Sequence, residues 1–288
     1  MNEINEMVYG HAQAKKMLSV LLKRSQDRYY TKCVKGGSEY KDTLKCLMIG
    51  SSGTGKTHLI QSFSKLNNFP LICLDATQLM PAGNSEGLNI KQLKKMIDEK
   101  CIEYVKRPEY HSVEGVMNQL VIFVDEFDKL GTSFDSSGNW NKHVQSNFLT
   151  MIDNKEEFAG ISWVFAGAFA SVFEEKNRQS NKNSIGFFPS ADVEGEYEIT
   201  DADILKAGII PEMLGRISLI VQLDVFSRED YKNVLMTLLP KYTLELDEAS
   251  IEAIVAKAHD SGQGIRSLTR QLEMLSIDIE YKSIKIHP

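Results

Sequence analysis

Cysteine is scarce in this sequence, and its spacing excludes a metal-binding or disulfide framework. The chain of 288 residues contains four cysteines, at positions 33, 46, 73 and 101. None of them forms a C-x-x-C pair or lies in a Cys/His cluster, which is typical of reduced thiols and gives no zinc-site pattern. We therefore expect a cytoplasmic protein without a zinc site.

The sequence also lacks an excess of basic residues and a long apolar run. Its formal net charge is −6 at pH 7, which argues against broad, nonspecific DNA binding but leaves a local basic patch open. The longest mostly apolar stretch, residues 161–173, is shorter than the ~20 residues that span a bilayer. The first ten residues lack the basic-then-apolar pattern of a signal peptide. We expect neither nucleic acid nor a membrane as a partner.

Hydrophobic residues make up 42% of the chain, enough for a globular protein with a sizeable core. Five short apolar runs predict strands, at residues 46–49, 71–74, 120–124, 161–165 and 219–223. Helical periodicity predicts helices at residues 11–24, 58–66, 90–105, 143–152, 200–207, 211–216, 229–239, 248–259 and 265–279. The polar stretch 174–198 predicts a long loop, whereas the polar stretch 106–118, which contains Pro108, is assigned to neither a helix nor a strand.

The order of these elements predicts two domains. Strands and helices alternate up to residue 224, and the run at 120–124 has the pattern of a strand buried on both faces of a parallel sheet. From residue 226 onward the pattern is purely helical. We therefore expect an α/β domain with a parallel sheet at residues 1–224, followed by a small all-helical domain at residues 225–288.

The most specific pattern is GSSGTGKT at residues 50–57, between a predicted strand and a predicted helix. This is the P-loop spacing in the context that it requires. Glycines let the backbone wrap a phosphate, and loop amides with the helix N-terminus supply positive charge. Lys56 would bind the β- and γ-phosphates, and Thr57 would bind Mg²⁺. The expected ATP-binding residues are Ser52, Gly53, Thr54, Gly55, Lys56, Thr57 and His58. A glycine-rich turn with a chance lysine is the alternative, which the two flanks disfavour.

Two carboxylates follow the buried run at 120–124. Asp125 and Glu126 end a strand where a parallel sheet presents its ligands. Asp125 can hold Mg²⁺, and Glu126 can polarise the water that attacks the γ-phosphate. A solvated acidic strand end is the alternative, and the P-loop earlier in the chain disfavours it. We expect Asp128 and Lys129 to be surface charges only.

Several motifs now stand in a fixed order along the chain. They are Val8-Tyr9-Gly10, GSSGTGKT, VIFVDEFDKL, AGAF, IPEMLGR and GQGIRSL. In this order the sequence resembles AAA+ ATPases of the ClpX/HslU type in the Clp/Hsp100 family, closest to the ClpX ATPase core without its zinc-binding domain. The resemblance covers nearly the whole chain. It implies a P-loop NTPase fold, ATP and Mg²⁺ as cofactors, and a homo-oligomeric ring, a hexamer in this family, that hydrolyses ATP between subunits.

The resemblance also implies roles for single residues. Arg216 matches the arginine finger that reaches the γ-phosphate of a neighbouring subunit, whereas without the family it would be expected to bind the last carbonyls of a helix. Arg266 matches the sensor-2 arginine that contacts phosphate, with a solvated arginine at a helix start as the alternative. Val8 and Tyr9 match the segment beside the adenine, a role compatible with apolar packing of this arm.

Other positions concern partners of the ring. Ile185, Gly186 and Phe187 stand where ClpX carries the tripeptide that docks on a ClpP-type peptidase, and a loop packed on its own domain remains an equal alternative. The first pore loop corresponds to residues 83–87, GNSEG, and lacks the aromatic residue that grips substrate. No polar side chain stands near residues 166–167, at the sensor-1 position.

The resemblance implies an ATPase that remodels or unfolds a protein substrate. Because residues 83–87 contain no aromatic residue, a nucleotide-switched scaffold that does not thread substrate stands as the alternative. A DNA-acting AAA+ protein is a third reading, which the acidic balance and the lack of a basic stretch with interleaved aromatic residues disfavour.

Overall fold

The computed structural model describes residues 2–78, 90–131, 139–154, 158–183, 198–242 and 244–284. The chain divides into two compact units, which we describe separately. The sheet unit comprises Ala12–Ile49 and Phe63–Gln222. The P-loop unit comprises Met1–His11, Gly50–Ser62 and Leu223–Pro288. The expected division into domains at residue 224 stays a prediction.

Five parallel strands form the sheet, in the order β2-β3-β4-β1-β5. They are β1 (Lys45–Ile49), β2 (Leu71–Asp75), β3 (Val121–Asp125), β4 (Ser162–Gly167) and β5 (Leu219–Gln222). All five predicted strands are confirmed, and β4 is buried along its whole length, as expected of a strand covered on both faces. Asp75 and Asp125 are register partners at the carboxyl ends of β2 and β3. The expected α/β fold with a parallel sheet is therefore confirmed.

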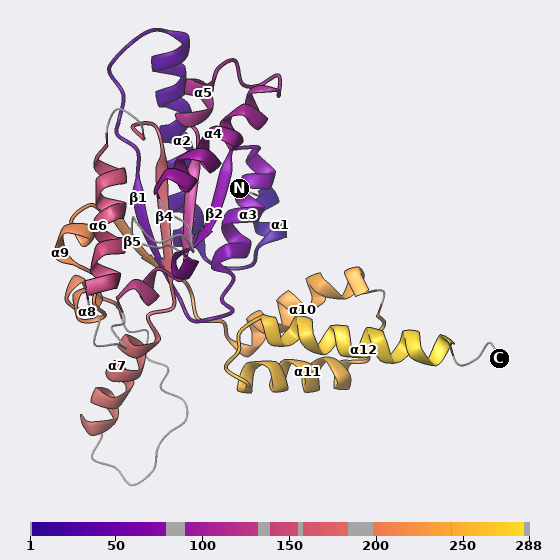
Figure 1. Cartoon of the computed structure of the whole chain (residues 1–288). Coiled ribbons are helices and arrows are strands. Elements are labelled where there is room, and N and C mark those ends of the chain that lie inside the picture. Colours follow the sequence, from indigo (N-terminus) through magenta and orange to yellow (C-terminus); the bar gives the residue numbers. More distant parts are fainter. Residues whose placement is uncertain are drawn as a thin grey trace. The chain divides into compact units, whose positions relative to one another are not determined.

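Helices surround the strands (Figure 1). In the sheet unit they are α2 (Ala12–Tyr29), α4 (Ile90–Val105), α5 (Val113–Met117), α6 (Asn139–Asp153), α7 (Ala170–Asn183), α8 (Asp201–Lys206) and α9 (Pro211–Leu214). Shorter turns are η1 (Tyr30–Val34), η2 (Ala76–Gln78) and η3 (Phe127–Leu130). Helix α8 begins with a reciprocal capping box between Thr200 and Asp203.

One helix extends into a predicted loop, and another lies in a stretch that the sequence pattern left unassigned. Helix α7 includes residues 174–183, so the predicted loop at 174–198 is wrong for that part. Helix α5 lies inside the polar stretch 106–118, where the Ser112 side chain accepts a hydrogen bond from the Gly115 amide and caps the helix. A further short helix, α1 (Asn2–Met7), precedes the predicted N-terminal helix.

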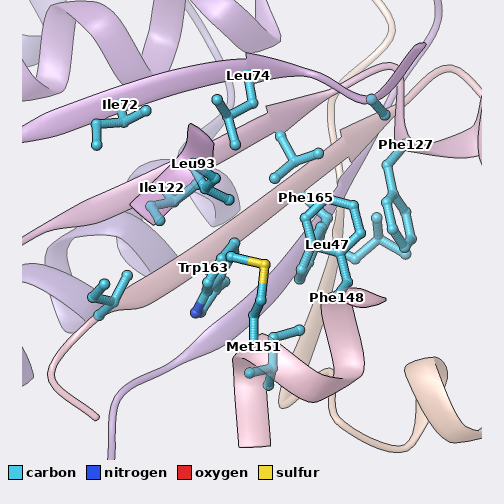
Figure 2. Packing of buried hydrophobic residues seen from close by; sticks show 14 of the residues in the cluster. Leu47, Ile72, Leu74, Leu93, Ile122, Phe127, Phe148, Met151, Trp163 and Phe165 are labelled. Atoms are coloured by element: carbon cyan, nitrogen blue, oxygen red, sulfur yellow. The ribbon is translucent and has the colours of Figure 1, made fainter. Parts of the chain in front are cut away.

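The core of the sheet unit lies between the strands and their helices. Figure 2 shows Phe148 and Met151 of α6 packed toward Trp163 and Phe165 of β4. Phe148 meets Trp163 edge to face, with 6.1 Å between ring centroids, and both rings are buried. Burial of such rings contributes roughly 2–3 kcal/mol each, which fixes the strands whose carboxyl ends carry Asp125 and Gly167.

The P-loop unit has its own helical core. Helices α10 (Arg228–Tyr242), α11 (Glu248–Asp260) and α12 (Arg266–Ile284) lie side by side (Figure 1). Their contact is formed by fully buried apolar side chains, among them Leu235, Ala258 and Leu268. The predicted helical character of this region is confirmed. Helix α3 (Lys56–Asn67) begins in this unit and continues into the sheet unit.

The four cysteines all lie in the described part of the chain, and none of them forms a disulfide. Burial raises the pKa of Cys46 to about 12 and that of Cys101 to about 11, so both stay protonated at neutral pH. None of the described helices is both long enough and apolar enough to cross a membrane.

Candidate nucleotide site

The loop between β1 and α3 has the backbone shape of a phosphate-binding loop. Gly53 and Gly55 adopt φ angles of +81° and +91°, which L side chains rarely adopt. Helix α3 begins at Lys56, directly after Gly55. The first amides of this helix have no carbonyl partner one turn earlier, so its N-terminus presents donors and partial positive charge. The predicted strand, glycine loop and helix are therefore confirmed.

The Lys56 side chain is 9% exposed and lies within the loop. Its Nζ atom donates to the carbonyl oxygens of Gly50 at 2.5 Å and Ser51 at 3.1 Å. These two bonds fix the ammonium group beside the loop backbone, where a cation favours an anionic ligand. The hydroxyl group of Thr54 also donates to the Ser51 carbonyl, at 2.8 Å, and closes the turn. Thr57 is half-buried, and Ser52 and His58 are exposed.

Two carbonyl oxygens of the loop accept hydrogen bonds from residues outside it. The Gly53 oxygen accepts from the Ile265 amide at 3.1 Å, and the Thr54 oxygen bonds Nε2 of His11 at 2.8 Å. A Cβ atom on Gly53 would lie 2.3 Å from the Gln263 carbonyl oxygen. The loop therefore packs against the residues just before α12, with the two backbones in direct contact.

The N-terminal segment contacts helix α10 and the residues just before it, within the same unit. Val8 is buried, whereas Tyr9 is 37% exposed and its hydroxyl group accepts a hydrogen bond from Asn233 of α10 at 3.2 Å. The Tyr9 ring meets Phe226 edge to face at 6.2 Å. The structure thus brings the segment predicted to flank adenine, the P-loop and the start of the helical region into one compact unit.

Arg266 is the first residue of α12 and is exposed. It directly follows Ile265, whose amide bonds the P-loop. An exposed arginine at a helix start opposes the helix dipole unless an anion lies nearby. Its phosphate-sensing role stays a prediction, supported by this position in the chain.

The acidic pair stands at the carboxyl end of β3, in the sheet unit. Asp125 is half-buried, and Glu126 is exposed with a φ angle of +53°. The Glu126 amide donates to Oδ1 of Asp125 at 2.9 Å. Left-handed backbone is uncommon for a residue other than glycine and is often found at functional sites.

Asp128 is not a surface charge, so that prediction is wrong. Its side chain is 7% exposed, and its carboxylate accepts hydrogen bonds from the amides of Ala168 at 3.2 Å and Phe169 at 3.1 Å. These amides directly precede α7, which begins at Ala170. Asp128 thereby joins the turn after Glu126 to the end of β4. Lys129 is exposed, as predicted.

Arg216 follows α9 in the sheet unit and is half-exposed. Its Nε and Nη2 atoms donate to Oδ2 of Asp153, at 3.1 and 2.8 Å. Asp153 is the last residue of α6. The guanidinium group is thus held by a carboxylate rather than by the last carbonyls of a helix, and it is positioned at the surface.

Asp153 and Asp128 were missed by the sequence analysis because their partners are distant in the chain. Asp75 was also missed, although its strand end adjoins that of Asp125; its carboxylate accepts from Thr77. The predicted docking tripeptide Ile185, Gly186 and Phe187 and the pore-loop residues 83–87 lie outside the described residues.

Comparisons with known proteins agree with this geometry. Residues 46–187 match the family described as "ATPase family associated with various cellular activities (AAA)". The chain is also similar to the "ATP-dependent Clp protease ATP-binding subunit ClpX" of Treponema denticola, with 24% identity over 329 aligned positions that cover 98% of this chain and 76% of that protein. The matched range of residues includes the P-loop and the acidic pair at the end of β3. The chain is therefore similar to ATPases of the AAA family and to a ClpX subunit, in agreement with the resemblance that the order of its motifs indicated.

Proposed function

We propose that this ATPase assembles into a homo-oligomeric ring and uses ATP at subunit interfaces to remodel or unfold a protein substrate. The P-loop supports the nucleotide part, because its backbone and Lys56 have the arrangement that phosphate binding requires. The name of the Treponema relative, an ATP-binding subunit of a protease, supports a protein substrate. A head-to-tail interface of this kind closes into a ring when its rotation permits.

Mg²⁺ suits the donor groups of this chain. Thr57 supplies a hydroxyl group at the start of α3, and Asp125 supplies a carboxylate at the end of β3. Mg²⁺ prefers oxygen ligands. It usually keeps several water ligands, and phosphate oxygens of the nucleotide supply further ligands. When bound, it neutralises charge on the β- and γ-phosphates. Glu126 would orient water for attack, and Arg216 would act on the nucleotide of an adjacent subunit.

The first experiment measures ATP turnover in single variants. Glu126→Gln should bind ATP and hydrolyse it far more slowly than the wild type. Lys56→Ala should lose nucleotide binding, whereas Lys65→Ala, an exposed lysine on the same helix, should keep it. Turnover near the wild-type rate in Glu126→Gln would refute the role of this carboxylate.

A mixing experiment tests whether Arg216 acts between subunits. Arg216→Ala alone should lose about 10³–10⁵ in rate, as measured for other arginine fingers. A ring that mixes Glu126→Gln and Arg216→Ala subunits contains interfaces with one intact Glu126 and one intact Arg216, so mixing should restore activity. If the mixture stays as inactive as each variant alone, Arg216 does not act in trans.

Substrate remodelling requires its own assay. A tagged, stably folded protein should unfold when ATP is supplied, and addition of a ClpP-type peptidase should lead to its degradation if Ile185, Gly186 and Phe187 form the docking tripeptide. ATP turnover without unfolding would favour the nucleotide-switched scaffold instead. Where the peptidase does degrade the substrate, Phe187→Ser should abolish degradation and leave ATP-dependent unfolding intact.

A further inference from the structure

His11 is the most deeply buried polar residue outside the P-loop that contacts the loop. Its side chain is 1% exposed, and its φ angle is +58°, next to Gly10 at +65°. Two successive residues in the left-handed region cost energy unless their surroundings fix them. The Phe226 ring, stacked on the His11 ring at 4.8 Å, occupies the space beside Gly10.

Each ring nitrogen of His11 has a defined partner. Nε2 lies 2.8 Å from the Thr54 carbonyl oxygen, which can only accept, and Nδ1 lies 3.2 Å from the Asp224 amide, which can only donate. The neutral ring with its proton on Nε2 satisfies both bonds. In return, the His11 amide donates to Oδ2 of Asp224 at 2.5 Å.

The bond to Thr54 fixes one peptide group of the P-loop. In a trans peptide the carbonyl and the following amide point in opposite directions. When His11 holds the Thr54 carbonyl, the amide of Gly55 must point away from His11. Amides of this loop are the groups that bind phosphate in a P-loop, so the orientation of the Gly55 amide depends on His11.

We propose that His11 is a positioning residue for nucleotide binding: it orients the Gly55 amide and ties the P-loop to Asp224, at the start of the helical region. The inference rests on the proposed role of residues 50–57 in phosphate binding. Because the amide acts on the bound nucleotide both before and during reaction, loss of its orientation weakens binding and leaves the chemical step unchanged. The effect therefore falls on KM rather than on kcat.

Two substitutions at His11 separate its two hydrogen bonds. An asparagine side chain reaches only as far as Nδ1, tolerates left-handed backbone and loses the bond to Thr54. A glutamine side chain reaches as far as Nε2 and keeps that bond. We expect His11→Asn to raise the KM for ATP about tenfold, the result of leaving a buried carbonyl unsatisfied, with kcat within twofold. His11→Gln should restore a KM close to that of the wild type.

Phe226→Leu is the matched control, because it removes the ring stacked on His11 and leaves the hydrogen bonds in place. Its KM should stay within twofold of the wild type, and an equal rise in Phe226→Leu would assign the effect to packing and overturn the proposal. Lys56→Ala tests the proposed function itself. If Lys56→Ala loses ATP binding while His11→Asn keeps the wild-type KM, the role of His11 is refuted and the nucleotide site stands. If Lys56→Ala binds ATP normally, the proposed function and this inference both fail.

Hydrogen exchange in the wild-type protein gives a second test that needs no variant. A non-hydrolysable ATP analogue should slow exchange in residues 50–57 and also in residues 222–227, which contain the Asp224 amide bound by His11. Slowing confined to residues 50–57 would contradict the proposed tie between the loop and Asp224.

Discussion

The contact between the P-loop and the residues before α12 makes Gly264→Ala an informative substitution. Gly264 has a φ angle of +67°, and an added Cβ would lie 2.6 Å from the Gly53 carbonyl carbon. Non-bonded carbon atoms prefer about 3.5–4.0 Å, so the two backbones would have to separate by about 1 Å. The hydrogen bond from Ile265 to Gly53, now 3.1 Å long, cannot survive that separation.

Gly262 provides the matched control for this substitution. Its φ angle is +64°, and an added Cβ would meet nothing within 4 Å. Both alanine variants share the strain of left-handed backbone, about 1–2 kcal/mol, but only Gly264→Ala clashes with the loop. The difference between them is therefore the cost of the broken contact, about 1–3 kcal/mol for a buried carbonyl left without its donor.

The assay is titration of each variant with a fluorescent ATP analogue, together with thermal melting. We expect a Kd at least tenfold weaker for Gly264→Ala than for Gly262→Ala, because a shifted Gly53 carbonyl also turns the adjoining Thr54 amide. Both variants should lose melting temperature through backbone strain, and Gly264→Ala should lose more because its contact with the loop is also broken. Equal nucleotide affinities in the two variants would show that the contact with Gly264 does not shape the P-loop, and the reasoning would be wrong.

Three further predictions concern the sheet unit. Asp153→Asn should lower ATP turnover in an ATPase assay, because Arg216 loses the carboxylate that holds it. In urea denaturation the same variant should change the free energy of unfolding by less than about 1 kcal/mol, since exposed ion pairs contribute little. Gln145→Met should cost roughly 3 kcal/mol in urea denaturation, because the fully buried Gln145 bonds the carbonyls of Leu130 and Gly208 and the amide of Ile210. Burial alone would raise the pKa of Asp203, but hydrogen bonds from Lys176 and Thr200 lower it to about 2, so its carboxylate stabilises the fold by about 2 kcal/mol above pH 4. That stability is lost as the pH falls from about 4 to 2, and the difference between the wild type and Asp203→Asn in urea denaturation should vanish over this range.

The strands and the P-loop could be predicted from sequence because their signals are local. A buried parallel strand reads as a continuous apolar run, and the run at β3 ends in its acidic pair without help from distant residues. The glycine spacing of the P-loop likewise lies within eight consecutive residues. Local patterns of this kind specify which residues form an element and where it ends.

Asp128 and helix α7 were misjudged for one shared physical reason. The start of α7 has no polar cap in its own sequence, and residues beyond Phe173 are mostly polar, so the helix gave no local signal. The amides before it are satisfied by Asp128, which lies 40 residues earlier in the case of Ala168. A bond between such distant residues becomes visible only when the fold places β3 beside β4.

The P-loop shows how far a local motif determines its own geometry. The motif supplies the glycines, the lysine and the helix start, but two of its carbonyls are held by His11 and Ile265, from opposite ends of the chain. Because each held carbonyl fixes the direction of the next amide, the donors for phosphate are oriented by residues that the motif does not contain. If these amides bind phosphate as proposed, a rearrangement that moves Asp224 or Gly264 should change phosphate affinity, and by reciprocity bound nucleotide should favour one arrangement of these segments. An ATPase that converts nucleotide state into movement requires this kind of coupling, and we propose that in this chain the backbone hydrogen bonds of the P-loop would carry it.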